Sequence, residues 1–128
     1  MSPQTITILV AGGLFVHGVG HSLGFFKPTR SWALGFLSDR ARRITANLFW
    51  AVAGLGFILA ALGFLGIAVP NEVWRDLAVV SSIISLTGIL LFFGNWPMFN
   101  TAGALAFNIV TLICLLRLHW PPVELYGG

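Results

Sequence analysis

The stretch ITANLFWAVAGLGFILAALGFLGIAV, residues 44–69, contains neither a charged side chain nor a proline. A helix that crosses the hydrocarbon core of a bilayer needs about 20 consecutive, mostly apolar residues. Backbone amides and carbonyls in lipid must be hydrogen-bonded within the chain, so an apolar run of this length is expected to be a membrane-spanning helix. Residues 5–26, 73–93 and 99–118 are also long and mostly apolar, and we expect three further spans there.

Prolines separate these four stretches. Pro28, Pro70 and Pro97 lie in the three breaks, and Pro121 follows the last stretch. Proline lacks an amide hydrogen and clashes with the preceding helical turn, so each of these positions predicts a helix end. The second and third breaks are only a few residues long, which favours antiparallel neighbours. The expected fold class is all-α: an integral membrane bundle of four helices, ordered up-down-up-down, in a single domain over residues 1–128.

The composition excludes several other classes of protein. Hydrophobic residues make up 57% of the chain and charged residues 9%, whereas soluble domains carry roughly 25% charged residues. A water-soluble enzyme and a disordered segment are therefore excluded. The single cysteine, Cys114, excludes an internal disulfide and a cysteine-cluster metal site, and we expect no metal site. We expect no nucleic-acid binding, because the basic residues are few and form no recognised motif.

The distribution of basic residues predicts an orientation. The first break and the start of the second helix hold Lys27, Arg30, Arg40, Arg42 and Arg43. By the positive-inside rule this side is cytoplasmic, both termini lie on the non-cytoplasmic side, and the expected location is a bacterial inner membrane. No lysine or arginine precedes the first span, so a cleaved signal peptide is not expected. Arg40, Arg42 and Arg43 could contact lipid headgroups or a partner, or only set the topology. Ser38 and Asp39 predict the start of the second helix.

The segment GGLFVHGVGHSLG, residues 12–24, is the main candidate for function. His17 and His21 are four residues apart and therefore share one face of a helix. Glycines lie on or near that face, and small residues recur in the second span at a similar spacing, which favours close helix packing. The predicted packing positions are Gly13, Gly20 and Gly24 in the first span, and Ala53, Gly56, Ala60 and Gly63 in the second.

Three roles are open for the two histidines. Each imidazole could hydrogen-bond a neighbouring helix, and the candidate partners are Asn47, Thr87 and Asn108. One of them could instead ligate haem or a chlorophyll-type pigment, although two ligands on one helix face cannot hold the same haem from both sides. Proton handling or acid–base catalysis is the third role, but no carboxylate inside a span could orient the imidazole.

The leading functional hypothesis is a small, non-enzymatic integral membrane protein. It would be an accessory or structural subunit, in contact with lipid and with other membrane subunits or further copies of itself. One alternative is a tetrapyrrole-binding subunit that uses His17 or His21. Another is a small lipid-active enzyme or carrier that uses a polar cluster of His17, His21, Asn47 and Asn108. The last alternative predicts a cavity that opens to lipid or to one face, whereas a purely structural subunit predicts no cavity.

Overall fold

The protein is helical throughout the described part of the chain. The computed structural model describes residues 1–126, and these contain no strand. The four long helices are α1 (Pro3–Gly20), α2 (Asp39–Phe64), α3 (Trp74–Leu91) and α4 (Met98–Leu112). Shorter segments extend, precede or follow them: the 3-10 helices η1 (His21–Phe26), η2 (Asn71–Val73) and η4 (Val123–Leu125), and the π-helical turn η3 (Ile113–Arg117). The all-α fold class is confirmed.

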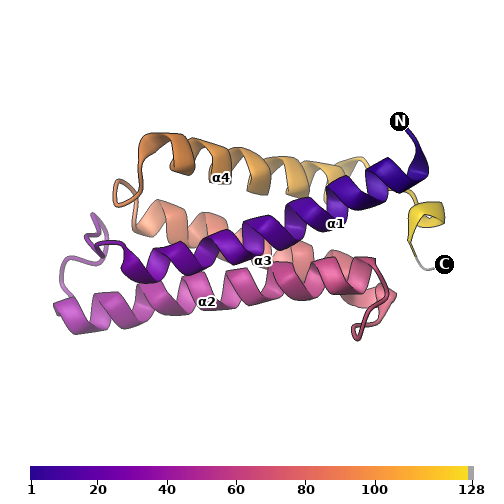
Figure 1. Cartoon of the computed structure of the whole chain (residues 1–128). Coiled ribbons are helices and arrows are strands. Elements are labelled where there is room, and N and C mark those ends of the chain that lie inside the picture. The colour runs from indigo at the N-terminus through magenta and orange to yellow at the C-terminus, as the bar shows by residue number, and fades with distance from the viewer. Residues whose placement is uncertain (127–128) are drawn as a thin grey trace.

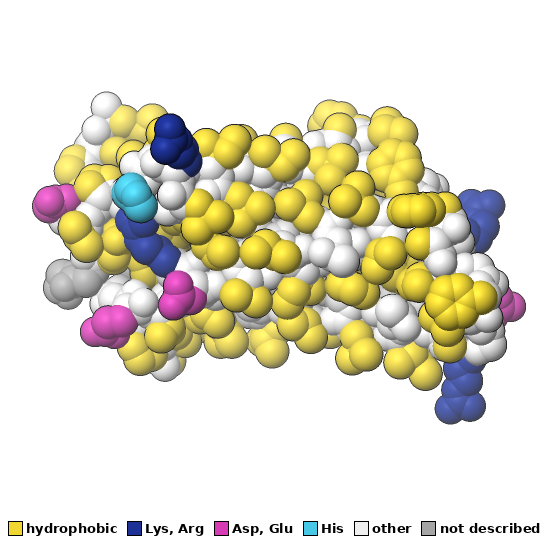
Figure 2. Space-filling model, turned by 180° about the vertical axis from the view of Figure 1, so that it is seen from behind, with side chains coloured by type: hydrophobic (Ala, Val, Ile, Leu, Met, Phe, Trp, Pro, Cys, Tyr) yellow, Lys and Arg dark blue, Asp and Glu magenta, His cyan; other side chains and the backbone are white. Residues whose placement is uncertain are grey.

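Four helical segments are long and apolar enough to cross a membrane. They cover Pro3–Phe26, Asp39–Phe64, Asn71–Leu91 and Met98–Arg117, with mean hydropathy values between 1.5 and 1.9. Hydrophobic side chains cover the middle of the face seen in Figure 2, and charged side chains gather at its two ends. The length and surface of these helices are consistent with a multi-pass membrane protein.

The four helices lie lengthwise beside one another, and the N-terminus and the C-terminal segment lie at the same end of the molecule (Figure 1). Helix α2 packs against both α1 and α3, and α4 packs mainly against α3. In the most apolar windows, 44% of α2 and 39% of α3 are buried, against 22% of α1 and 17% of α4. Helices α1 and α4 make few direct contacts with each other.

Helices α1 and α2 approach each other backbone to backbone at Gly18 and Gly54. A Cβ on Gly18 would lie 2.7 Å from the carbonyl oxygen of Gly54, and a Cβ on Gly54 would lie 2.8 Å from that of Gly18. Only glycine at both positions lets the two backbones come this close. Ala11, Leu14, Gly18 and His21 are buried, and their helical spacing defines the inward face of the first span.

Side-chain hydrogen bonds cap both ends of α2, and hydropathy alone does not predict both ends correctly. The Ser38 hydroxyl accepts a hydrogen bond from the Ala41 amide at 3.1 Å, so the predicted start of this helix is confirmed. The helix ends at Phe64, although the apolar run continues to residue 69. The Asn71 carboxamide donates to the carbonyls of Gly63 and Phe64 at 2.6 and 3.3 Å and thereby caps the helix. Hydropathy does not reveal this cap.

Candidate functional site

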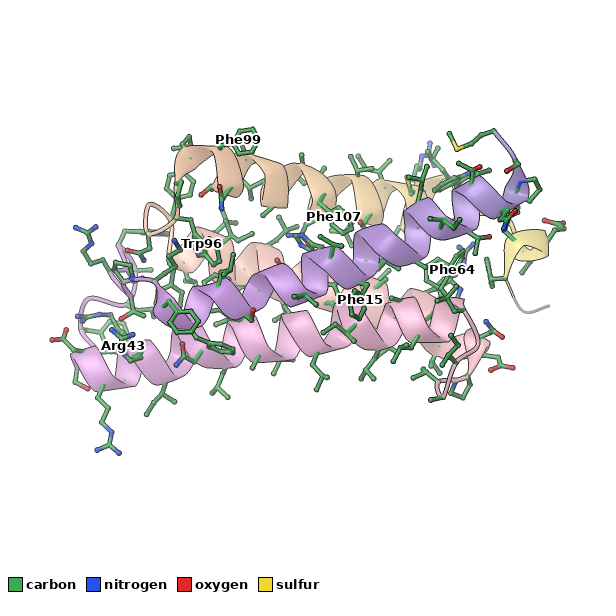
Figure 3. All side chains as sticks on the ribbon, in the orientation of Figure 1. Phe15, Arg43, Phe64, Trp96, Phe99 and Phe107 are labelled. Atoms are coloured by element: carbon green, nitrogen blue, oxygen red, sulfur yellow. The ribbon has the colours of Figure 1, made fainter. Side chains whose placement is uncertain are left out.

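A cavity of about 350 Å³ lies between α1 and α4, at the end of the bundle opposite the chain termini. Helices α1 and η1 form one wall and α4 forms the other. Trp50 of α2, Ile89 of α3 and Trp96 complete the lining. Its residues are Val16, His17, Gly20, His21, Leu23, Trp50, Ile89, Trp96, Phe99, Asn100, Thr101, Gly103 and Ala104. Figure 3 shows Trp96 near the end of this seam and Phe107 farther along it.

Two glycines leave room for the cavity. Gly20 and Gly103 line it from opposite walls, and a Cβ at either position would meet nothing within 4 Å. Gly20 was predicted to pack against another helix, but the structure places it at this open space. Its backbone is helical, with φ −57° and ψ −30°, so the absence of a side chain is not required by backbone conformation. The two positions therefore contribute space.

His21 stands where α1 tightens into the 3-10 helix η1. Its backbone amide bonds the Gly18 carbonyl instead of the His17 carbonyl, as expected for this tighter turn. The His17 carbonyl is taken instead by Nδ1 of the His21 ring, at 2.9 Å. Because a carbonyl only accepts, Nδ1 is the donor. Nε2 of the neutral ring then accepts from the Ser85 hydroxyl at 2.8 Å. The His21 ring thus replaces a backbone amide as the donor to the His17 carbonyl, and it also accepts a hydrogen bond from α3.

Ser85 joins three helices through its hydroxyl. It lies on α3, donates to His21 of η1 and accepts a hydrogen bond from Nδ2 of Asn108 on α4 at 2.8 Å. Ser85 and Asn108 are fully buried, and His21 is 6% exposed. A buried polar network of this kind fixes the relative positions of the helices that contribute to it. The interhelical hydrogen bond predicted for one histidine is present, but its partner is Ser85.

His17 belongs to the cavity wall and to an aromatic cluster. Its ring stacks on Phe107, with 4.2 Å between centroids and an interplanar angle of 23°. Phe57 and His21 meet the same ring edge-on, each at a centroid distance of 4.8 Å. Nε2 of His17 and Oδ1 of Asn108 are buried and have no hydrogen-bond partner among residues 1–126. Aromatic contacts therefore hold the His17 ring in place.

The other predicted polar residues are not part of this network. Thr87 is exposed, and its hydroxyl donates to the Ile83 carbonyl of its own helix at 2.8 Å. Asn47 is half-buried, and its Oδ1 has no hydrogen-bond partner in the described residues. Of the three predicted partners only Asn108 joins the cluster. The serines of α3 lie at 81, 82 and 85, and their helical spacing was the available signal for Ser85.

The glycines and alanines that were predicted to pack between helices have different neighbours in the structure. A Cβ on Gly24 would meet the Trp50 indole at 2.5 Å, and one on Gly13 would meet Phe107 at 3.5 Å. Gly56 and Gly63 face Ser81 and Trp74 of α3, and Ala53 and Ala60 are fully buried. Two glycines that the spacing argument did not single out, Gly18 and Gly54, bring the backbones of α1 and α2 together.

The two histidines differ in their suitability as tetrapyrrole ligands. An axial ligand presents a ring nitrogen to the metal. Both ring nitrogens of His21 are hydrogen-bonded, whereas Nε2 of His17 has no hydrogen-bond partner in the described residues, so His17 is the candidate ligand of the two. Over residues 1–126, no three side chains of histidine, cysteine, aspartate or glutamate gather as a metal site would require.

The three arginines at the start of α2 have different roles. Arg42 donates to the carbonyls of Thr29 and Leu37, at 3.2 and 2.6 Å, and forms an ion pair with Asp39. It therefore holds the preceding loop against the helix. Arg40 and Arg43 are exposed and remain candidates for contact with headgroups or a partner.

We expect Arg42→Ala to release this loop while Arg43→Ala does not. Loss of a hydrogen bond to a charged donor costs ~1.5–3 kcal/mol, so backbone hydrogen exchange in the loop should rise about tenfold or more. Both variants remove one positive charge from the same turn, which makes Arg43→Ala the matched control. Equal exchange in the two variants would show that the Arg42 hydrogen bonds do not hold the loop.

The chemistry of the site suits an apolar chain with one polar end. The cavity wall is mostly aliphatic and aromatic, and its polar members are His17, His21, Asn100 and Thr101. Ligand sites typically combine an apolar lining with a few placed polar groups of this kind. No protein-family model, curated protein or solved structure matches this chain.

Proposed function

We propose that this chain is a multi-pass membrane protein that binds an acyl chain of an anionic phospholipid between α1 and α4. The observation that carries the proposal is the cavity of about 350 Å³ in this seam. A purely structural subunit predicts no such cavity, whereas a lipid carrier does. The protein remains a non-enzymatic one in this proposal, because Ser85, the hydroxyl that pairs with His21, is fully buried outside the cavity lining.

The size and position of the cavity support a membrane lipid as the occupant. Ligand pockets typically measure ~300–1,000 Å³, and this one is at the lower end of that range. It lies between the two least buried helices, which make few direct contacts with each other, so its opening faces the lipid that surrounds the bundle. One acyl chain can enter sideways without leaving an apolar environment.

The charge near the cavity supports an anionic headgroup. The Lys27 ammonium lies 5.3 Å from the ring centroid of Trp96, a residue of the cavity lining. Three exposed arginines lie in the loop before α2 and in its first turns. They are Arg30, Arg40 and Arg43. Each basic residue near an anionic membrane surface contributes about 1 kcal/mol. The headgroup would lie beside Lys27, with its chain running inward along α1 and α4.

The same charges support an orientation. We place the loop between α1 and α2 on the cytoplasmic side and both termini on the other side, in a bacterial inner membrane, because basic loops are retained in the cytoplasm. The bound lipid then comes from the cytoplasmic leaflet, which is where anionic lipids create the negative surface potential.

A second candidate function is an accessory subunit of a larger membrane complex or homo-oligomer. The low burial of α4 favours this function. Only 17% of its most apolar window is buried against the rest of the chain, so its outer face is free to pack against another helix. A partner helix in the α1–α4 seam would exclude the lipid, so the two candidates are distinguished by what occupies this seam.

The test compares Gly20→Leu with Gly12→Leu. Both glycines are on α1 and have nothing within 4 Å of a Cβ, but only Gly20 lines the cavity. The purified protein is titrated with phosphatidylglycerol, and bound lipid is counted by native mass spectrometry. We expect Gly20→Leu to weaken binding about tenfold or more, because the new side chain overfills the site, while Gly12→Leu binds as the wild type does.

Lys27→Gln provides the second arm, because it removes the charge without filling the cavity. We expect it to reduce the preference for phosphatidylglycerol over phosphatidylcholine. If Gly20→Leu and the wild type bind equally well, the lipid is not in this cavity. If the protein retains a stoichiometric membrane partner and no lipid, the accessory-subunit function replaces the proposed one.

A further inference from the structure

We infer that Phe107 sets the length of acyl chain that the cavity accepts. This inference rests on the proposed function and adds a specificity-determining residue to it. Phe107 lies on α4, beyond the end of the cavity, and its ring is stacked on His17 in the cavity wall. Because His17 lines the larger cavity and Phe107 is stacked on it, the pair would meet a chain that runs along the α1–α4 seam from that cavity. Phe107 is labelled in Figure 3.

A second, smaller cavity lies on the other side of this stack. Its volume is about 160 Å³, and it continues along the same seam toward the chain termini. Leu9, Val10 and Gly13 of α1 line it together with Phe107, Val110 and Cys114 from the α4 side. His17 lines the larger cavity and Phe107 lines the smaller one, so the His17–Phe107 pair is the partition between them.

Several contacts hold Phe107 in this position. The ring is stacked on His17 at 4.2 Å, and it meets Phe57 at a centroid distance of 6.0 Å and an angle of 78°. It also covers Gly13, whose Cβ would lie 3.5 Å from Cε2 of Phe107. The aromatic ring therefore packs against α1 at van der Waals distance and closes the seam at this depth.

The partition divides acyl chains by length. A chain that ends before the stack fits the larger cavity without moving a side chain. A longer chain meets the stacked rings and must displace Phe107, which is an overpacking cost of the kind that amounts to about a fivefold to hundredfold loss of affinity. Truncation of Phe107 to alanine joins the two cavities and removes this obstacle.

The experiment measures binding of dilauroyl and dipalmitoyl phosphatidylglycerol to the purified full chain by native mass spectrometry. We expect the wild type to bind the shorter lipid about tenfold more tightly, and Phe107→Ala to bind both about equally. Phe107→Leu, a smaller change in the core, should lie between them. Phe15→Ala is the matched control, because Phe15 is 46% exposed and lines neither cavity.

Two outcomes separate this inference from the function on which it rests. If the wild type binds neither lipid, the proposed function is wrong and the inference falls with it. If the wild type binds both lipids, and the ratio of their affinities in Phe107→Ala and Phe107→Leu equals the wild-type ratio, lipid binding stands and Phe107 does not set the length. Binding of the shorter lipid by each variant also shows that the variant is folded.

Discussion

Replacement of Gly18 by leucine is expected to destabilise the bundle by about 3 kcal/mol or more, the upper end of the usual cost of overpacking. A Cβ at this position would lie 2.7 Å from the Gly54 carbonyl oxygen and 3.1 Å from the Ile58 amide nitrogen. Both are backbone atoms, which cannot rotate away as a side chain does. Helices α1 and α2 must therefore separate, and the buried contacts on either side of Gly18 are lost with them.

Gly12→Leu is the matched control for this prediction. Gly12 is on the same helix, and a Cβ there would meet nothing within 4 Å. Unfolding of both variants in detergent, followed by circular dichroism against temperature, gives the comparison. Gly54→Leu should resemble Gly18→Leu, since its Cβ would lie 2.8 Å from the Gly18 carbonyl oxygen. Similar stability of Gly18→Leu and Gly12→Leu would contradict the close approach of α1 and α2.

The buried network around Ser85 is the subject of the second prediction. We expect His21→Leu to cost about 1–3 kcal/mol, because the His17 carbonyl and the Ser85 hydroxyl each lose a buried partner. Interhelical hydrogen bonds within membranes average about 0.6 kcal/mol, so the orphaned groups account for most of the cost. Asn108→Leu should also destabilise the protein, because it removes the donor to the Ser85 hydroxyl.

A double-mutant cycle tests whether these residues act together. His21 and Asn108 both bond the Ser85 hydroxyl, so we expect a coupling free energy of about 0.5–3 kcal/mol between their substitutions. The control is Thr87→Val on the same helix as Ser85, because the Thr87 hydroxyl bonds only its own helix. Its effect should stay within about 0.5 kcal/mol. Additive effects of His21→Leu and Asn108→Leu would show that Ser85 does not link them.

The four helices could be predicted from the lengths of the apolar runs and the prolines between them. Each run is long enough to cross a bilayer as a helix, and a helix satisfies every backbone hydrogen bond within its own segment. The start of α2 was equally predictable, because a serine cap acts on amides within its own first turn. That two histidines share a helix face also follows from spacing, and the structure places both of them in the cavity lining.

The polar partners of these histidines could not be predicted in the same way. Ser85 lies 64 residues from His21, and it was not among the predicted partners. Thr87 was predicted, but two positions farther along the same helix its side chain faces outward. Helix rotation about its own axis decides between the two residues, and this rotation depends on how α3 packs against its neighbours.

The glycines show most clearly which features the sequence predicts and which depend on contacts between helices. Spacing identifies small residues that permit close packing, but it does not distinguish Gly18, which meets the α2 backbone, from Gly20, which lines an open cavity. Composition and periodicity act within one helix, so they specify that four helices form and which residues share a face. The cavity, the His17–Phe107 partition and the Ser85 network each depend on contacts between helices, and these arise only when the bundle is assembled.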